Sequence, residues 1–201
     1  MEKETIQVEI PAGKKAAWVD GFLKLVDTEE EQKKDERPIT ERVKTFEDAC
    51  NELGENHKLV QQFKAIHEAI AEDKEATAYF KLGIITAALN EGWEPDFTND
   101  EEYRYYPYLC LWSKEELEKT TDAWKYERNL QLWLGGGSSD FGANCGLAYA
   151  RSDFAWSNAA ASISARLAHK TEQLAIYSGK QFTELWANYT TGKEVKSWRN
   201  S

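Results

Sequence analysis

The spacing of apolar residues changes near Trp93, and of all the sequence features this change most restricts the possible folds. Before Trp93, apolar residues recur three and four positions apart, which is the repeat of an amphipathic helix. After Trp93, many of them alternate with polar residues, which is typical of half-buried strands. Helices in one segment followed by strands in the next predict the α+β class, with a small irregular antiparallel β unit.

Three helices joined by short turns are predicted between residues 38 and 92. Gly54 follows the first apolar stripe and Asn90-Glu91-Gly92 follows the third, and both are typical helix ends. We therefore expect a helical layer in which each helix buries its stripe. The three stripes are Phe46, Ala49, Cys50 and Leu53; Leu59, Phe63, Ile66 and Ile70; and Ala76, Phe80, Gly83, Ile84 and Ala87.

A β-hairpin is predicted near the start of the sequence. Asp20-Gly21 separates the apolar runs 18–19 and 22–26, and Asp-Gly readily forms the two-residue turn of a hairpin. Residues 27–37 are highly charged and have no apolar repeat, so we expect a solvated linker that provides spacing.

A strand that ends near Trp112 is predicted after the helical layer. Pro107 restricts part of it to a sheet edge or a bulge, because proline has no N–H to donate to a neighbouring strand. The sequence 113–116, Ser-Lys-Glu-Glu, has the form of a capping box and predicts a short helix.

The remaining sequence predicts two more strands and a closing helix. The strands are expected at residues 126–134 and 163–169, and a long helix is expected from Thr171 to Tyr189. We predict one compact domain from residue 38 onward. The expected parts of the chain are a hairpin and acidic linker (1–37), a helical layer (38–92), and an aromatic-rich β unit with the C-terminal helix (93–201).

Acidic residues are concentrated in the first two thirds of the chain. Residues 1–128 hold 30 acidic and 18 basic residues, and residues 129–189 hold four of each, in a chain of net charge −10. Negative charge repels nucleic acids and anionic lipids, so neither double-stranded nucleic acid nor a membrane is an expected partner. The sequence has no apolar run of about 18 residues to span a bilayer and no signal-peptide core, which predicts a cytoplasmic protein.

The sequence contains no motif that identifies a reaction. Cys50, Cys110 and Cys145 are far apart, without the spacing of a zinc site or a disulfide framework. The nearest nucleophilic set is Cys145 with Asp153 and His169, but a packed thiol and a strand histidine explain these residues more simply. We expect no cofactor and no metal, and an enzyme with a site assembled from scattered residues remains an alternative.

Three other patterns fall short of known sites. The glycine run at 135–139 lacks the lysine of a phosphate-binding loop, so a plain loop is favoured. The acidic cluster at 96–102 lacks the EF-hand pattern. His57 and His67 are not at a metal-binding spacing.

Aromatic residues between Trp93 and Trp156 exceed what a small core usually requires. Tyrosine and tryptophan dominate binding hot spots, and they also pack between sheets and helices, so we expect some to be core and several to face a partner. The candidate binding residues are Tyr103, Tyr105, Tyr106, Tyr108, Trp133, Tyr149, Arg151, Trp156 and Arg166.

Four blocks of the sequence stand out: Ala88–Phe97, Tyr103–Tyr108, Ser164–Thr171 and Leu174–Phe182. These blocks resemble small proteins encoded by phages and prophages of anaerobic gut bacteria. The likeness spans the chain from its IPAGKK opening to about Tyr189, although a Phe is more usual at His169 and a Gly at or beside Ala165. This family has no established reaction, so the resemblance implies only a mobile-element origin. Residues 133–170 are also similar in composition to display regions of C-type-lectin-like phage proteins.

These observations favour a non-catalytic interaction protein of phage or prophage origin. Its contact face would be the nearly uncharged aromatic region 103–170, its partner another protein, a ligand or a second copy of itself, and its location the host cytoplasm or the virion. The acidic first two thirds leave a second hypothesis open, an acidic accessory of phage DNA metabolism or an inhibitor of a host defence protein.

Overall fold

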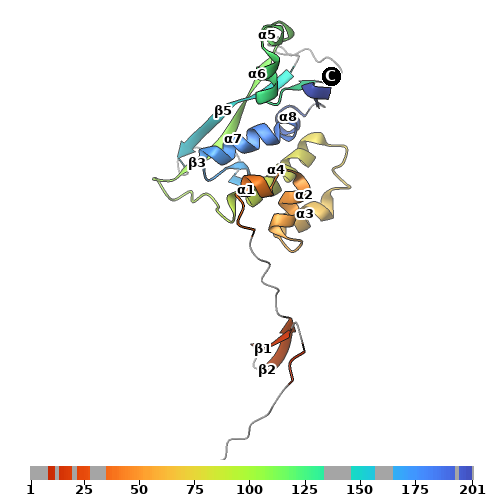
Figure 1. The fold of residues 1–201 in the computed structure, drawn as a ribbon, viewed down its shortest axis with the longest axis vertical. Helices are drawn as coiled ribbons and strands as arrows, with labels where there is room; N and C mark the ends of the chain where they lie inside the picture. The colour runs from red at the N-terminus through yellow and green to blue at the C-terminus, as the bar shows by residue number, and fades with distance from the viewer. Residues whose placement is uncertain are drawn as a thin grey trace, which may run out of the picture. The chain divides into compact units, whose positions relative to one another are not determined.

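The computed structural model describes residues 9–11, 14–19, 22–27, 35–133, 146–156, 165–192 and 195–200. The chain divides into two units, residues 1–36 and residues 37–201. The first unit contains a two-stranded hairpin, and the second contains the helices and a four-stranded sheet (Figure 1). This mixture of helices and antiparallel strands confirms the α+β class.

The N-terminal hairpin is confirmed. Strands β1 (Lys14–Val19) and β2 (Phe22–Asp27) pair antiparallel, and Val19 lies opposite Phe22. This register leaves two residues for the connection, as expected for an Asp-Gly turn. The turn residues themselves lie outside the described residues.

The helical layer is also confirmed, with a short helix in addition. Local capping explains where two of these helices begin: Thr45 and Asp48 form a reciprocal capping box, and the Asp73 carboxylate accepts from the Ala76 N–H. Gly54 follows the second helix with a φ of 81°, which favours glycine. The helices are α1 (Ile39–Arg42), α2 (Phe46–Leu53), α3 (Lys58–Ile66) and α4 (Lys74–Asn90).

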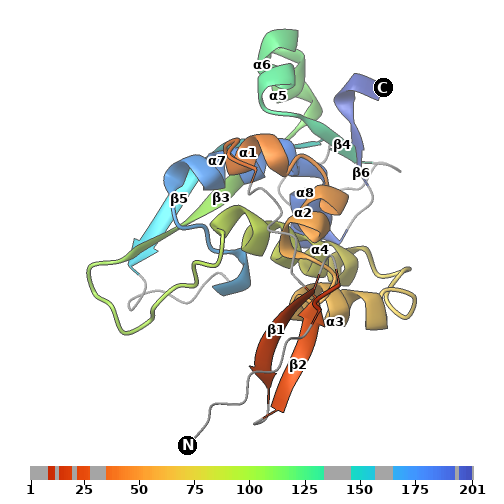
Figure 2. The same ribbon diagram turned by 60° about the horizontal axis from the view of Figure 1, so that its bottom comes forward.

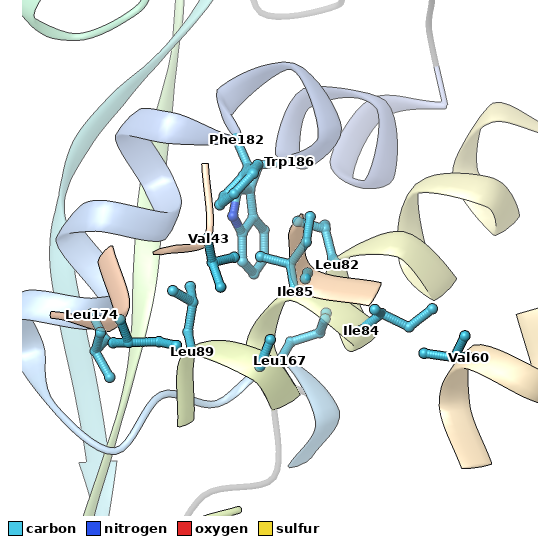
Figure 3. Close-up of a cluster of buried hydrophobic side chains, with 13 residues drawn as sticks. Val43, Val60, Leu82, Ile84, Ile85, Leu89, Leu167, Leu174, Phe182 and Trp186 are labelled. Atoms are coloured by element: carbon cyan, nitrogen blue, oxygen red, sulfur yellow. The ribbon is translucent and has the colours of Figure 1, made fainter. Parts of the chain in front are cut away.

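Helix α4 lies at the centre of the main hydrophobic core. It is apolar around most of its surface, as expected for a helix that is covered on several sides. Leu82, Ile85 and Leu89 are fully buried, and Figure 3 shows them among other buried side chains, including Val43 just after α1 and Trp186 of a C-terminal helix. This core joins the helical layer to the C-terminal helices.

The sheet of the second unit is antiparallel, with the strand order β3-β5-β4-β6. Two short helices, α5 (Lys114–Glu118) and α6 (Asp122–Glu127), lie near β4 at one end of the sheet (Figure 2) and contribute to a small second core around Leu130. The short helix predicted after Ser113 is therefore confirmed. The strands are β3 (Tyr103–Trp112), β4 (Gln131–Trp133), β5 (Gly146–Trp156) and β6 (Val195–Ser197).

The predicted long C-terminal helix is two helices. Helix α7 (Glu172–Gln181) ends at Phe182, whose φ of −112° and ψ of 30° are not helical, and α8 (Thr183–Thr191) follows at once. The Thr183 hydroxyl donates to the Gly179 carbonyl, a local bond of the kind that bends helices. The bend lets α7 pack on β3 and β5 (Figure 1) while α8 packs on α4.

Two predicted strands are largely wrong. Residues 122–127 form α6 because the Thr121 hydroxyl accepts from the Trp124 N–H and starts a helix, which leaves only β4 of the strand expected at 126–134. Within the range 163–169, the described part is a 3-10 turn, η1 (Ala165–Leu167), followed by a single bridge at His169. Strand β5 was not expected.

Asn90 joins the end of α4 to the sheet. The backbones of Tyr105 and His169 exchange two hydrogen bonds of 3.0 and 2.7 Å, which adds residue 169 to the edge of β3. On the other side of this segment, the Asn90 side chain donates to the Ala168 carbonyl and accepts from the Lys170 N–H. One buried amide thus takes the place of a further strand.

Candidate functional site

Strand β3 lies at the edge of the sheet, and half of its edge is open. Tyr105 directs its N–H and C=O away from β5, toward His169. Because these groups alternate along a strand, Pro107, Leu109 and Leu111 face the same way. Pro107 has no N–H to lose there, which confirms the edge position expected from the sequence.

The backbone groups of Leu109 and Leu111 have no partner on this open edge among the described residues. The outward N–H and C=O of Tyr105 are paired with His169, and Pro107 has a carbonyl acceptor but no N–H donor. The open edge therefore presents two N–H and three C=O groups in sequence. Such a row is the usual template for the addition of an extended strand.

A groove of about 470 Å³ runs beside this open edge. Helix α8 forms its second wall, and its lining is mainly apolar. Leu111 is 45% exposed and Tyr108 is 43% exposed, so the described residues do not fill the groove. We call this groove with the open edge the β3 groove; it is lined by Tyr106–Leu109, Leu111, Asp153, Trp186 and Tyr189–Thr191.

Charged residues gather at one end of the β3 groove. The Arg151 guanidinium carbon lies 4.6 Å from the centroid of the Tyr108 ring, and Arg151 also forms an ion pair of 3.2 Å with Asp153. The pKa of Asp153 is lowered, first because its carboxylate accepts from the Phe154 N–H and second because of Arg151. The carboxylate therefore stays charged, and the pair holds the Tyr108 ring from one side.

A separate aromatic cluster lies farther along the same two strands. The ring centroids of Tyr103 and Phe154 are 5.0 Å apart in an edge-to-face arrangement, and Tyr105 lies 6.1 Å from Phe154. Phe154 is 56% exposed, so the cluster presents apolar surface to solvent. Such pairs stabilise a strand pair, and an exposed ring of this size is also available for contact.

The structure does not bring all of the predicted binding residues together. Tyr106, Tyr108 and Arg151 meet at the β3 groove, and Tyr103 and Tyr105 form the aromatic cluster beside it. The main chains of Trp133 and Trp156 belong to β4 and β5, and their side chains lie outside what the structure describes. The other two residues occupy different places.

Tyr149 and Arg166 lie away from the groove. Tyr149 is 5% exposed and packs beneath α7, where burial raises the pKa of its phenol and the Arg128 guanidinium opposes this shift. Arg166 is exposed and lines a different cavity, next to Gly83.

The nucleophilic set considered from the sequence is not assembled by the described residues. Cys145 lies outside them. His169 is fully buried, and burial lowers the pKa of its imidazole to about 4, although the nearby Tyr105 carbonyl opposes the shift. Neither ring nitrogen of His169 forms a hydrogen bond of good geometry. Asp153 lies on β5, where its carboxylate forms an ion pair with Arg151.

The described residues contain neither a metal-binding cluster nor a membrane-spanning helix. Within the ranges the structure describes, no three His, Cys, Asp or Glu side chains are grouped to hold a metal ion. None of the described helices is long and apolar enough to cross a membrane.

Comparison with known proteins adds no relative: no family model, no curated protein and no solved structure matches this chain.

Sequence reasoning missed three residues that shape the site. Leu109 and Leu111 were part of an expected strand, and Tyr189 was one residue of an expected helical stripe. The only signal for the open edge was Pro107, which excludes a central strand at that position. Nothing local in the sequence indicates that α8 lies beside β3.

Proposed function

We propose that this chain is a non-catalytic interaction protein that binds an extended segment of a partner protein along the β3 groove. The mobile-element origin implied by the family resemblance is part of this proposal: the protein would be encoded by a phage or prophage and act in the host cytoplasm or on the virion. One observation carries the proposal: the backbone edge of β3 at Leu109 and Leu111, which has no partner among the described residues, lies beside an apolar groove.

Backbone pairing would supply the general affinity. A strand added at Leu109 and Leu111 would form hydrogen bonds with groups that have no partner among the described residues. Each such bond contributes about 1 kcal/mol net, so a few of them support binding that depends little on partner sequence.

Side-chain contacts would supply the selectivity. In an added strand, alternate side chains point to the same face, so every second residue of the partner would enter the groove between β3 and α8. Tyr108, Leu111 and Tyr189 favour apolar or aromatic residues at those positions. The Arg151–Asp153 pair at one end favours a polar residue there.

The test selects short linear peptides from a random displayed library on the whole protein and measures their affinity by fluorescence polarisation. We expect selected peptides to share an alternating apolar pattern. The Leu111→Pro variant removes one edge N–H at a position equivalent to Pro107, so it should leave β5 paired and weaken binding about tenfold. Leu111→Ala is the matched control, because it removes the side chain and keeps the N–H.

Three results would overturn the proposal. The first is that no peptide is selected, and the second is that Leu111→Pro binds as tightly as Leu111→Ala. The third is a dimer, detected by light scattering, that Leu111→Pro dissociates, because the occupant of the edge would then be a second copy of the chain.

A further inference from the structure

A second cavity lies beside α4 and the segment that follows it. It has a volume of about 430 Å³, within the range of small-molecule sites. Helix α4 forms its floor at Gly83 and Thr86, and the segment after α4 forms a wall with Trp93 and Phe97. The Trp93 indole N–H donates to the Glu102 carboxylate, which holds that wall in place.

The floor of this cavity carries a polar atom with no partner. Thr86 is 1% exposed, and its hydroxyl oxygen is buried without a hydrogen bond. Asn90, one turn further along α4, also lines the cavity, but its side chain is fully used by Ala168 and Lys170. A buried hydroxyl without a partner is costly, and it indicates that another group completes its hydrogen bond.

A buried guanidinium packs on the ring of Phe97, one of the residues that line the cavity. Arg104 is 3% exposed, and its guanidinium carbon lies 5.0 Å from the centroid of the Phe97 ring. Its Nη1 has no partner, and Arg104 forms no ion pair within the described ranges. Phe97 is 46% exposed, so the ring beside this guanidinium also borders solvent.

A second arginine with a shielded side chain, Arg42, shows what Arg104 lacks. The Arg42 side chain pairs with the carboxylates of both Glu52 and Glu91. In a chain with 35 acidic residues, it is unexpected that a buried arginine packed on a cavity-lining ring has no carboxylate partner among the described residues. A buried charge is normally paired, so the missing carboxylate is the strongest pointer to the ligand.

We propose that this cavity binds a small aromatic acid that carries a second polar group. The flat ring packs against Trp93 and Phe97, and the carboxylate pairs with the Arg104 guanidinium next to Phe97. The second polar group bonds with the Thr86 hydroxyl at the floor. Arginine suits this role because its planar fork matches a carboxylate. This site is independent of the β3 groove.

The first test compares two probes on the unchanged protein by isothermal titration calorimetry. The probes are 6-hydroxy-2-naphthoate and its neutral methyl ester, which keeps the ring and the hydroxyl. We expect saturable one-to-one binding of the acid and at least about tenfold weaker binding of the ester, because a charged hydrogen bond is lost. This comparison needs no variant, so it cannot fail through misfolding.

Variants then assign the contacts. Arg104→Gln should reduce the preference for the acid over the ester to about one, and Thr86→Val should weaken the acid by about fivefold. Gly83→Leu places a side chain in the cavity and should abolish binding. Gly83→Ala is its matched control, because the added carbon would meet only the Arg166 Cβ at 3.9 Å. Leu111→Pro should leave probe binding unchanged.

The opposite results are equally specific. Equal affinity for the acid and the ester would overturn the assignment of the guanidinium as the anion site. Undiminished binding in Gly83→Leu would place the probe elsewhere. Absence of binding by both probes would overturn the proposal.

Discussion

The helical side and the sheet side of the second unit treat their apolar residues in opposite ways. On α4, Leu82, Ile85 and Leu89 are fully buried, whereas Leu111 and Phe154 on β3 and β5 are about half exposed. The difference shows that folding buries the apolar face of α4 and leaves part of the apolar sheet surface exposed and available for contact.

Backbone and side-chain polar groups follow the same division. At the end of α4, the Asn90 side chain forms hydrogen bonds with the backbone of both neighbours of His169. On β3, the outward groups of Leu109 and Leu111 are unpaired among the described residues. Under the proposed function, stability depends mainly on the helical side and binding on the sheet side, and substitutions can test this division.

The largest expected effect is the contrast between two leucines. Leu89→Ala leaves a cavity in the main core and should lower the free energy of unfolding by about 3 kcal/mol. Leu111→Ala removes a half-exposed side chain and should change it by less than about 0.5 kcal/mol. Urea unfolding of both variants measures the contrast. If the two losses were equal, the open side of the sheet would belong to the core.

The next effect concerns pH and the buried His169. This residue pairs with Tyr105 of β3, and its two neighbours form hydrogen bonds with Asn90 of α4. Its imidazole has a pKa of about 4 in the folded state, below its ordinary value of 6.5. The unfolded chain therefore binds a proton that the folded chain does not, and stability is lost as the pH falls from about 6.5 to 4. The loss from this group is about 3 kcal/mol at most.

His169→Phe removes this titration and keeps a flat aromatic ring at the fully buried position. Neither ring nitrogen forms a hydrogen bond of good geometry, so the substitution sacrifices little polar bonding. We expect the variant to lose less stability than the unchanged protein between pH 6.5 and 4 in parallel urea titrations. Identical pH profiles would show that the imidazole is not buried as a neutral base.

Local signals explain which parts of the fold could be predicted. Thr45 and Asp48, Asp73, and Ser113 fix helix starts through bonds that span only three residues, so the sequence pattern was sufficient. Thr121 is a cap of the same kind, but the residues that follow it also alternate in the manner of a strand. The helix formed because a capped turn needs no distant partner, whereas a strand does.

Strand β5 could not be predicted, because its sequence has no constant two-residue repeat. Ser152 lies opposite Pro107, but Tyr149 lies opposite Leu109, since the register shifts between Tyr108 and Leu109. The shift exchanges the faces of odd and even residues partway along β5. A bulge of this kind depends on two strands that are 40 residues apart in sequence and leaves no local mark.

The third prediction concerns Gly179, at which the helical side contacts the inner face of the sheet. A Cβ at this position would lie 2.5 Å from the Tyr149 ring and 2.6 Å from the Pro107 Cβ. Gly179→Ala should therefore force α7 away from the sheet and destabilise the protein by about 2 kcal/mol. Thermal unfolding measures this. A loss of less than about 0.5 kcal/mol would mean that the sheet adjusts freely to α7.

The candidate site was predictable only in part, for a related reason. Aromatic density and Pro107 indicated an edge strand with contact residues, and Tyr106, Tyr108 and Arg151 do line or flank one groove. The wall from α8 is about 80 residues away in sequence, and its position depends on the bend at Phe182. The polar groups at Thr86 and Arg104 were invisible, because an unpaired atom is a property of packing and not of sequence.

The smallest expected effect has the opposite sign and separates the two helix glycines. Gly83 lies inside α4, where glycine costs about 1 kcal/mol relative to alanine, and its Cβ would meet only the Arg166 Cβ at 3.9 Å. Gly83→Ala should therefore stabilise the protein by about 0.5–1 kcal/mol. Thermal unfolding of Gly83→Ala and of Gly179→Ala should be measured side by side. The comparison is between the α4 face that borders the cavity and the α7 face that packs tightly on the sheet. Destabilisation by Gly83→Ala would mean that this cavity is smaller than the structure shows, and it would weaken the aromatic-acid site before any ligand is tested.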